Sequence, residues 1–177
     1  MMHATLPAAA PPALRSRSSR RRSARVCASG AAAGTPQTNV PLVKEFLAAL
    51  PSLGSVRLIV QTGTVVLESV TTFEGLFYSP VPGKGEYGNL IKSKENVDMH
   101  LLVDKLACVK LVSSPGRGGD YTSHVLRFQS HAREEPACLS VFLMWPEGAA
   151  RGAYADGQVA AFQALEAKYG TELNLLL

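Results

Sequence analysis

The first 44 residues contain no aspartate or glutamate, although the chain of 177 residues has 14 of them. The same stretch holds six arginines among alanine, serine and proline, and it lacks the continuous apolar segment of a secretory signal. This composition is typical of organelle transit peptides. The letters ARVCASGAAA around Ala28 look like a plastid processing site. We therefore predict a chloroplast transit peptide at residues 1–28, a flexible linker at 29–39 and a single domain at 40–177.

Two other interpretations of the basic run RSRSSRRRS stay open: a nuclear-localisation or nucleic-acid patch, and a basic tail without structure. The extreme N-terminal position of the arginines favours targeting. Without residues 1–28 the chain carries 12 lysines and arginines against 14 acidic residues, so the net charge of +4 belongs to the targeting segment. The remaining domain has no basic excess that would indicate nucleic acid as a partner.

Several signatures of other protein classes are missing from the sequence. No apolar run approaches the length of a membrane span. The three cysteines show no CxxC spacing, and neither a P-loop nor a GxSxG motif occurs. We expect Cys108 and Cys138 to be small buried side chains, and the glycine clusters GKGEYG and PGRGGD to be hairpin connections. Glu134 and Glu135 are expected at a solvated turn.

Apolar spacing predicts one helix near each end of the domain. The first covers residues 41–50, with Thr38 or Asn39 as its cap and Pro51 at its end. The second covers 157–170, with Asp156 as N-cap and Gly170 as C-cap. Seven strand-like segments lie between them, and residues 81–89 are expected to form a loop. The segments are 55–61, 64–70, 73–80, 98–103, 106–114, 121–130 and 137–145.

Short turns between neighbouring strands predict antiparallel pairing, and Thr62–Gly63 marks the first hairpin. Helices segregated at the ends of an antiparallel sheet make an α+β domain. We therefore predict the α+β class, with an antiparallel β-sheet of about seven or more strands flanked by N- and C-terminal helices.

Three histidines lie outside the predicted transit peptide. His131 is expected at an exposed turn, and His124 on a strand face that it shares with apolar residues 126 and 128. On its own strand His100 shares a face with Asp98 and Leu102, while residues 99, 101 and 103 point the other way. This more polar face can line a cleft, but a single strand histidine is also commonly structural. Spacing alone leaves both roles open.

Four segments, read in order, resemble the haem-utilisation family of the ChuX/HutX type, single-unit relatives of the HemS haem carriers. The resemblance spans about residues 40–170 and rests on the order and spacing of the segments rather than on a catalytic signature. The segments are VRLIVQTGTVVLE (56–68), YGNLIKSKENVDMHLLVDKLACVKLV (87–112), ACLSVFLMW (137–145) and DGQVAAFQAL (156–165).

The resemblance implies a haem-binding domain that pairs as a homodimer and holds haem in a cleft beside a large sheet. The family's axial histidine, and hence the metal ligand, falls on His100. A second histidine used by some members falls on Gln61, which is not a usual iron ligand. The other axial position would then belong to water or to an unidentified residue. It also stays open whether this protein binds a different tetrapyrrole, or none.

A haem site needs a neutral imidazole, a flat apolar slot and cations for two propionates. Candidates for the slot are Phe73, Phe77, Phe142, Met144 and Trp145. Candidates for the cations are Arg57, Lys92, Lys94 and Arg127. Core packing and solvated charge are the alternative roles of these residues. Arg57 and Gln61 share strand parity, so we expect them beside His100 if those two strands adjoin.

The resulting hypothesis is a soluble plastid protein without a membrane span that carries or buffers haem, or a related tetrapyrrole, in the stroma. Whether the protein also catalyses a reaction stays open, and a binding role is favoured over an enzymatic one. One alternative is an enzyme that degrades the haem it binds. Another is an assembly or interaction protein that kept the fold without the cofactor.

Overall fold

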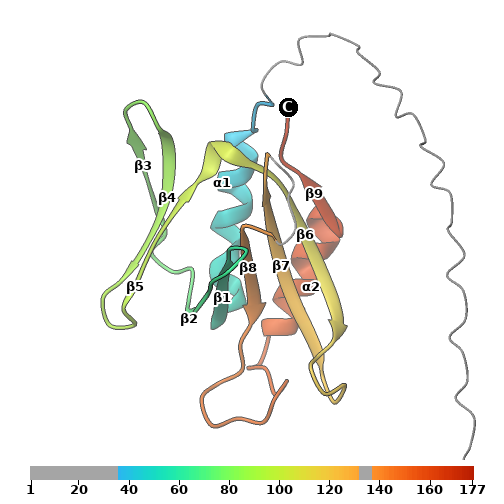
Figure 1. The fold of residues 1–177 in the computed structure, drawn as a ribbon. Coiled ribbons are helices and arrows are strands. Elements are labelled where there is room, and N and C mark those ends of the chain that lie inside the picture. Colours follow the sequence, from blue (N-terminus) through green and yellow to red (C-terminus); the bar gives the residue numbers. More distant parts are fainter. Residues whose placement is uncertain (1–35, 132–136) are drawn as a thin grey trace, which may run out of the picture. The chain divides into compact units, whose positions relative to one another are not determined.

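Two helices and nine strands make up the part of the chain that the computed structural model describes, residues 36–131 and 137–177 (Figure 1). The α-helices are α1 (Val40–Ala49) and α2 (Gln158–Tyr169), and short 3₁₀ helices cover Leu50–Leu53 and Val103–Lys105. The strands are β1 (Val56–Gln61), β2 (Val66–Thr71), β3 (Phe77–Val81), β4 (Gly85–Lys92), β5 (Val97–Leu102), β6 (Leu106–Pro115), β7 (Thr122–Ser130), β8 (Leu139–Leu143) and β9 (Glu172–Asn174). The predicted α+β class is confirmed.

Helix α1 begins at its predicted cap. The side-chain oxygen of Asn39 accepts a hydrogen bond from the backbone nitrogen of Leu42 at 3.2 Å, and a proline occupies the first turn. Val43, Phe46 and Leu47 are buried on one side. Their spacing of three and four residues is the apolar stripe that fastens the helix to the core.

Six strands form the larger sheet, in the order β2-β1-β8-β7-β6-β9, and every neighbouring pair is antiparallel. The predicted first hairpin is confirmed, because β1 and β2 pair from Val56 opposite Thr71 to Gln61 opposite Val66. Strand β1 also pairs with β8, which lies about eighty residues further along the chain. This long-range pairing places Arg57 opposite Phe142.

Both helices cover the same face of this sheet (Figure 1). Phe46 of α1 packs edge-on against Phe128 of β7, with ring centres 6.1 Å apart. Phe162 of α2 contacts His124, with ring centres 5.1 Å apart. His124 and Phe128 are four residues apart on one strand and therefore share a face. The core lies between this face and the two helices.

Strands β3, β4 and β5 form a separate three-stranded sheet, with β4 in the middle. One face packs on the core: Leu90 is fully buried, Val97 is nearly so, and Met99 and Leu101 lie against the same cluster. The opposite face is exposed, although Phe77 and Ile91 lie on it. Phe77 is 48% exposed and Ile91 50% exposed.

The structure corrects the prediction for residues 81–89. Only the turn around residues 82–84 connects β3 to β4, and the segment from Gly85 onward is strand. Because residues 83–85 are Gly-Lys-Gly, the two-residue alternation of side chains from Gly85 to Lys92 could not be recognised in the sequence. Strand β9 was not predicted because three residues are too few to show a period. Strand β9 forms by antiparallel pairing with the edge of β6.

The second helix differs from its prediction only at its start. Gly157, at a φ of 82°, is the residue before the first turn, and Asp156 does not cap the helix. No side chain caps the helix, and Oε1 of Gln158 instead accepts a hydrogen bond from the backbone nitrogen of Ala155, in the preceding loop, at 2.8 Å. Gly170 is confirmed as the C-cap, with a φ of 80° that suits glycine.

One smaller expectation also changes. Cys108 is buried as expected, but Cys138 is exposed. The predicted transit peptide, most of the linker and the Glu134–Glu135 pair lie outside the described residues.

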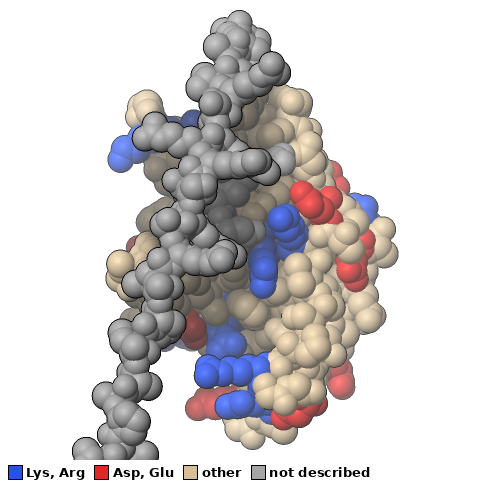
Figure 2. Space-filling model, turned by 45° about the vertical axis from the view of Figure 1, so that its right-hand side comes forward, with Lys and Arg blue, Asp and Glu red and all other residues tan. Residues whose placement is uncertain are grey.

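Within residues 36–131 and 137–177, no helix has the length and apolar character needed to cross a membrane. Basic and acidic side chains are interspersed over the face drawn in Figure 2, in keeping with the near balance of charge downstream of residue 28.

Candidate functional site

The hairpin of β4 and β5 places Asn89 directly opposite His100. Its turn at residues 93–96 ends with Asn96 in the left-handed region, at a φ of 53°, which asparagine tolerates better than most residues. Beyond the turn the side chains alternate. Val97 and Met99 point to the core, whereas Asp98 and His100 point away from it. The sequence prediction for the orientation of His100 is thereby confirmed.

A hydrogen bond of 2.6 Å joins Nδ1 of His100 to the side-chain oxygen of Asn89. Asn89 is 4% exposed. Its amide nitrogen donates to the Ser79 hydroxyl at 2.9 Å and to the backbone oxygen of Tyr87 at 3.1 Å. These acceptors fix which way the amide faces, so its oxygen must be the atom that meets the imidazole. Nδ1 of His100 therefore carries a hydrogen, and in the neutral ring the lone pair resides on Nε2.

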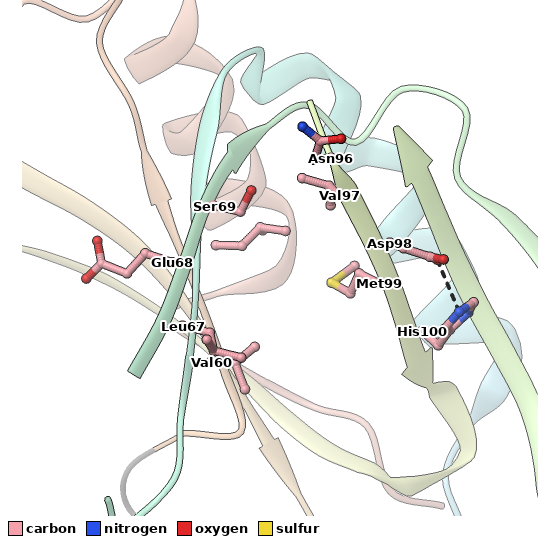
Figure 3. Close-up of a pocket in the computed structure, with 10 residues that line it drawn as sticks. Val60, Leu67, Glu68, Ser69, Asn96, Val97, Asp98, Met99 and His100 are labelled. Atoms are coloured by element: carbon pink, nitrogen blue, oxygen red, sulfur yellow. Dashed lines mark ion pairs between the residues drawn. The ribbon is translucent and has the colours of Figure 1, made fainter. Parts of the chain in front are cut away.

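The second ring nitrogen of His100 faces a carboxylate. Nε2 lies 3.1 Å from Oδ1 of Asp98, and both side chains project from the same side of β5 (Figure 3). Both side chains are more than half exposed, at 52% for His100 and 64% for Asp98. This contact is an ion pair only when the imidazole is protonated, and an exposed pair of this kind is weak. Nε2 can thus be offered to a metal when Asp98 swings aside.

Two open clefts meet at His100. The inter-sheet cleft has a volume of about 340 Å³ and lies between the β1–β2 hairpin and β5. Figure 3 shows Val60 and Leu67 facing Met99 across it, with Val97 beside Met99, so its walls are largely apolar. His100 stands at its rim and lies on the other side of β5 from Met99.

The outer cleft has a volume of about 490 Å³ and lies on the exposed face of the three-stranded sheet. His100 and Asn89 line it together with Tyr87, whose ring meets the imidazole edge-on at 6.4 Å between centres. Ser79, Val81 and Lys84 complete its lining.

The other predicted site residues line neither of the two clefts. Arg57 stacks over the ring of Phe142, with its guanidinium carbon 5.6 Å from the ring centre, and it approaches Glu68 at 3.6 Å. Gln61 and Arg127 belong to the same outward face of the six-stranded sheet, by strand alternation. Because β1 and β5 belong to different sheets, the condition for placing Arg57 and Gln61 beside His100 is not met.

The remaining candidates divide between core and surface. Nζ of Lys92 lies 3.4 Å from the Thr72 hydroxyl, away from both clefts. Phe73 is fully buried in the core, whereas Phe77 is exposed on the face that bears His100. Trp145 packs in an aromatic group with Tyr121 and Tyr154, so it does not line either cleft.

Sequence reasoning missed the roles of Asn89, Asp98 and Lys84. The hairpin itself carries the signal for Asn89, since a turn at 93–96 sets residue 89 opposite residue 100. Asp98 lies two residues from His100 on the same strand face. No local pattern indicates Lys84, because it reaches the cleft from the turn between β3 and β4.

The other two described histidines have structural partners. His124 is 7% exposed, and its Nδ1 lies 2.8 Å from the Ser113 hydroxyl. Burial lowers its pKa below the ordinary 6.5, and Glu166 opposes this only in part. His131 is half-buried rather than exposed as expected, because its Nε2 lies 2.7 Å from the Thr38 hydroxyl. In the described part of the chain no three His, Cys, Asp or Glu side chains gather as a metal site.

Comparison with known families and structures agrees with this fold. The family model of haem utilisation ChuX/HutX matches residues 38–165. Comparison with curated protein sequences finds no match.

Three solved structures illustrate the likeness. A protein from Agrobacterium tumefaciens is 22% identical with a TM-score of 0.57, over 75% of this chain and 70% of that one. The heme-binding protein ChuX is 20% identical with a TM-score of 0.56, over 75% of each chain. ChuS of Escherichia coli O157:H7, described as a heme-degrading enzyme, is 25% identical with a TM-score of 0.53, over 71% of this chain and 32% of ChuS. The first two likenesses establish the fold.

Proposed function

Because the chain belongs to the haem-utilisation ChuX/HutX family, we propose that it binds haem or a closely related tetrapyrrole reversibly through His100. In this proposal the protein carries or buffers the ligand and does not break its bonds. The observation that carries the proposal is the anchored imidazole. A buried amide holds Nδ1, and Nε2 stands at the junction of two clefts with only an exposed carboxylate beside it.

The described residues fit such a ligand in two ways. A bound haem supplies an iron centre that accepts a neutral imidazole nitrogen. Asn89 selects the tautomer that leaves Nε2 for this bond, and a histidine held through its other nitrogen is the usual arrangement of metal-ligating imidazoles. The clefts beside His100 offer apolar surface, from Val60, Leu67 and Met99 on one side and Val81 and Tyr87 on the other.

A haemin titration of the full chain, followed by Soret absorbance, tests the proposal. Saturable binding near one haem per chain is expected, and His100→Ala should weaken it and change the spectrum. His131→Ala is the matched control, because it removes a histidine that lies outside both clefts. The absence of saturable binding, or equal binding by His100→Ala, would overturn the proposal and favour an interaction protein that kept the fold.

A degrading activity is the second candidate, and the likeness to ChuS favours it. It is distinguished by adding an electron donor to the haem-loaded protein in air. A carrier keeps its Soret band under these conditions apart from reduction of the iron, whereas a degrading enzyme loses the band and releases iron.

The plastid location and the homodimer are also proposals. The acid-free composition of residues 1–28 supports import into the stroma, and a fluorescent fusion of these residues tests it. The edge strand β2 supports self-association, because Val66, Leu67 and Val70 on it are 52%, 67% and 45% exposed. Light scattering during gel filtration measures the number of copies.

A further inference from the structure

The two clefts at His100 differ in the charge that they offer a ligand. The inter-sheet cleft contains no basic side chain other than His100. Of its two acidic residues, Glu68 points away from Met99 and approaches Arg57 at 3.6 Å, and Asp98 contacts His100 (Figure 3). The outer cleft is lined by Lys84 and by no acidic residue, and the nearest carboxylate to its imidazole is that of Asp98, 3.1 Å from Nε2. A planar ligand with carboxylate arms is therefore better matched by the outer cleft.

Strand alternation also places the imidazole in the outer cleft. His100, Asn89 and Tyr87 all line it, and the hydrogen bond and the ring contact of His100 are made to these two neighbours. Ser79 lies opposite Tyr87 in the register of β3 and β4, so its side chain belongs to the same face. Phe77, opposite Asn89 and 48% exposed, continues the face with an aromatic ring.

Lys84 enters this cleft from the turn between β3 and β4. Its backbone nitrogen donates to the carbonyl of Val81 at 3.0 Å, which closes the turn and directs the residue back over the sheet. Among the described residues no carboxylate lies within ion-pair distance of Lys84. The nearest acid along the chain, Glu86, is already paired with Lys44 at 2.7 Å. The ammonium of Lys84 is thus available to a ligand.

The spacing of donor and cation suits a ligand of macrocycle size. Lys84, in the turn just before β4, lies five residues along the chain from Asn89, or at most ~16 Å at the usual rise of a strand. The long stem of the lysine shortens this distance, since both it and His100 reach one cleft. Because His100 ligates the metal at the centre of the macrocycle, the length to be matched is that from the centre to the end of one carboxylate arm, about half the span of the ligand, and the reach of the lysine stem makes up the difference.

Resting on the proposed function, we propose that the ligand lies on the outer face of the three-stranded sheet, with Lys84 holding one of its carboxylates while His100 ligates its metal. Tyr87 and Val81 supply apolar surface beneath the ring system. Lys84 therefore favours the binding of tetrapyrroles with a free carboxylate over those whose carboxylates are esterified.

A comparison of haemin with its dimethyl ester tests the role of Lys84. The wild-type chain is expected to prefer haemin by about fivefold, the range of a solvent-accessible ion pair. Lys84→Ala should lose this preference by weakening haemin binding and leaving ester binding unchanged. Arg117→Ala is the matched control, because it removes an exposed cation from the turn between β6 and β7, outside both clefts, and should bind both ligands as the wild type does.

Two bulky substitutions test the choice of cleft. Val81→Trp fills the outer cleft, and Val60→Trp fills the inter-sheet cleft from a side chain that is 40% exposed. Only Val81→Trp should weaken haemin binding, by about tenfold, since filling a binding cavity excludes the ligand sterically. Circular dichroism confirms that each variant is folded.

The outcomes separate this inference from the proposed function. If the wild type binds haemin through His100 but Lys84→Ala keeps the preference for the free acid, the role of Lys84 is wrong and the haem-binding proposal stands. If Val60→Trp blocks binding and Val81→Trp does not, the ligand lies in the inter-sheet cleft. If the wild type does not bind haemin, both proposals fail.

Discussion

Asn89 holds His100 from the neighbouring strand, with its amide oxygen 2.6 Å from Nδ1 of the imidazole. The amide is buried and its nitrogen is committed to Ser79 and to the backbone of Tyr87. It therefore determines both the tautomer and the orientation of the ring. The proposed metal ligand is exposed, yet its direction is set from within the sheet.

Replacing Asn89 with leucine should weaken haemin binding and the fold together. The backbone and hydroxyl acceptors lose their donor, so the free energy of unfolding should fall by ~1–3 kcal/mol. Haemin affinity should fall by about tenfold, because the imidazole is no longer oriented. Urea unfolding and Soret titration measure the two effects.

Gln158→Leu serves as the control for this variant. Gln158 is also a buried amide, 4% exposed, and its nitrogen donates to the carbonyls of Leu53 and Ser55 at 2.7 and 2.9 Å. It should lose comparable stability and keep its haemin affinity. Equal loss of affinity in both variants would show that Asn89 acts only through stability.

Asp98→Asn should tighten haemin binding by about two- to fivefold, the range expected for an exposed ion pair. The carboxylate of Asp98 contacts Nε2 of His100 and must leave before this nitrogen can ligate a metal. Asparagine keeps the shape and weakens the competition. Soret titration at neutral pH measures the change, with the exposed Asp156→Asn as control. Weaker binding by Asp98→Asn would mean that the carboxylate assists the site.

The buried His124 should make the protein less stable in mild acid. Burial lowers the pKa of this imidazole below 6.5, so the unfolded chain takes up a proton before the folded one does. The stability is complete above pH 6.5 and declines as the pH falls from 6.5 toward the lowered folded pKa. Urea midpoints between pH 8 and pH 5 measure this decline. His124→Gln should flatten this part of the profile, and His131→Gln should not.

Val66→Lys should convert the proposed homodimer into a monomer. Val66 is 52% exposed on the edge strand β2, and a lysine on such an edge opposes pairing with another strand. Ile91→Lys is the control, because Ile91 is equally exposed, at 50%, but lies in the three-stranded sheet. Gel filtration with light scattering reports the mass. A dimer that survives Val66→Lys would place the interface elsewhere.

Short-range patterns allowed much of the fold to be predicted. The cap at Asn39, the hairpin at Thr62–Gly63 and the end at Gly170 each depend on a few neighbouring residues. The two-residue period of a strand also established that His100 faces away from Met99. These features could be read because their causes lie within one turn or one strand.

Pairings between distant segments could not be predicted in the same way. The sequence indicated strands but not that β3, β4 and β5 would form a sheet of their own, so that β5, which bears His100, does not pair with β1, which bears Arg57 and Gln61. The membership of strands in sheets is decided by how the helices and the whole core pack. For the same reason β9, whose three residues have no period, forms only because β6 leaves an edge open to it.

The sequence by itself determined the α+β class, the resemblance to a haem-utilisation family and the outward direction of His100. Only the tertiary structure decided what surrounds this histidine: Asn89 at one ring nitrogen, Asp98 at the other, and Lys84 across the outer cleft. The physical reason is that backbone geometry sets which way a side chain points. Its neighbours come from other strands and turns, whose positions are settled by long-range packing.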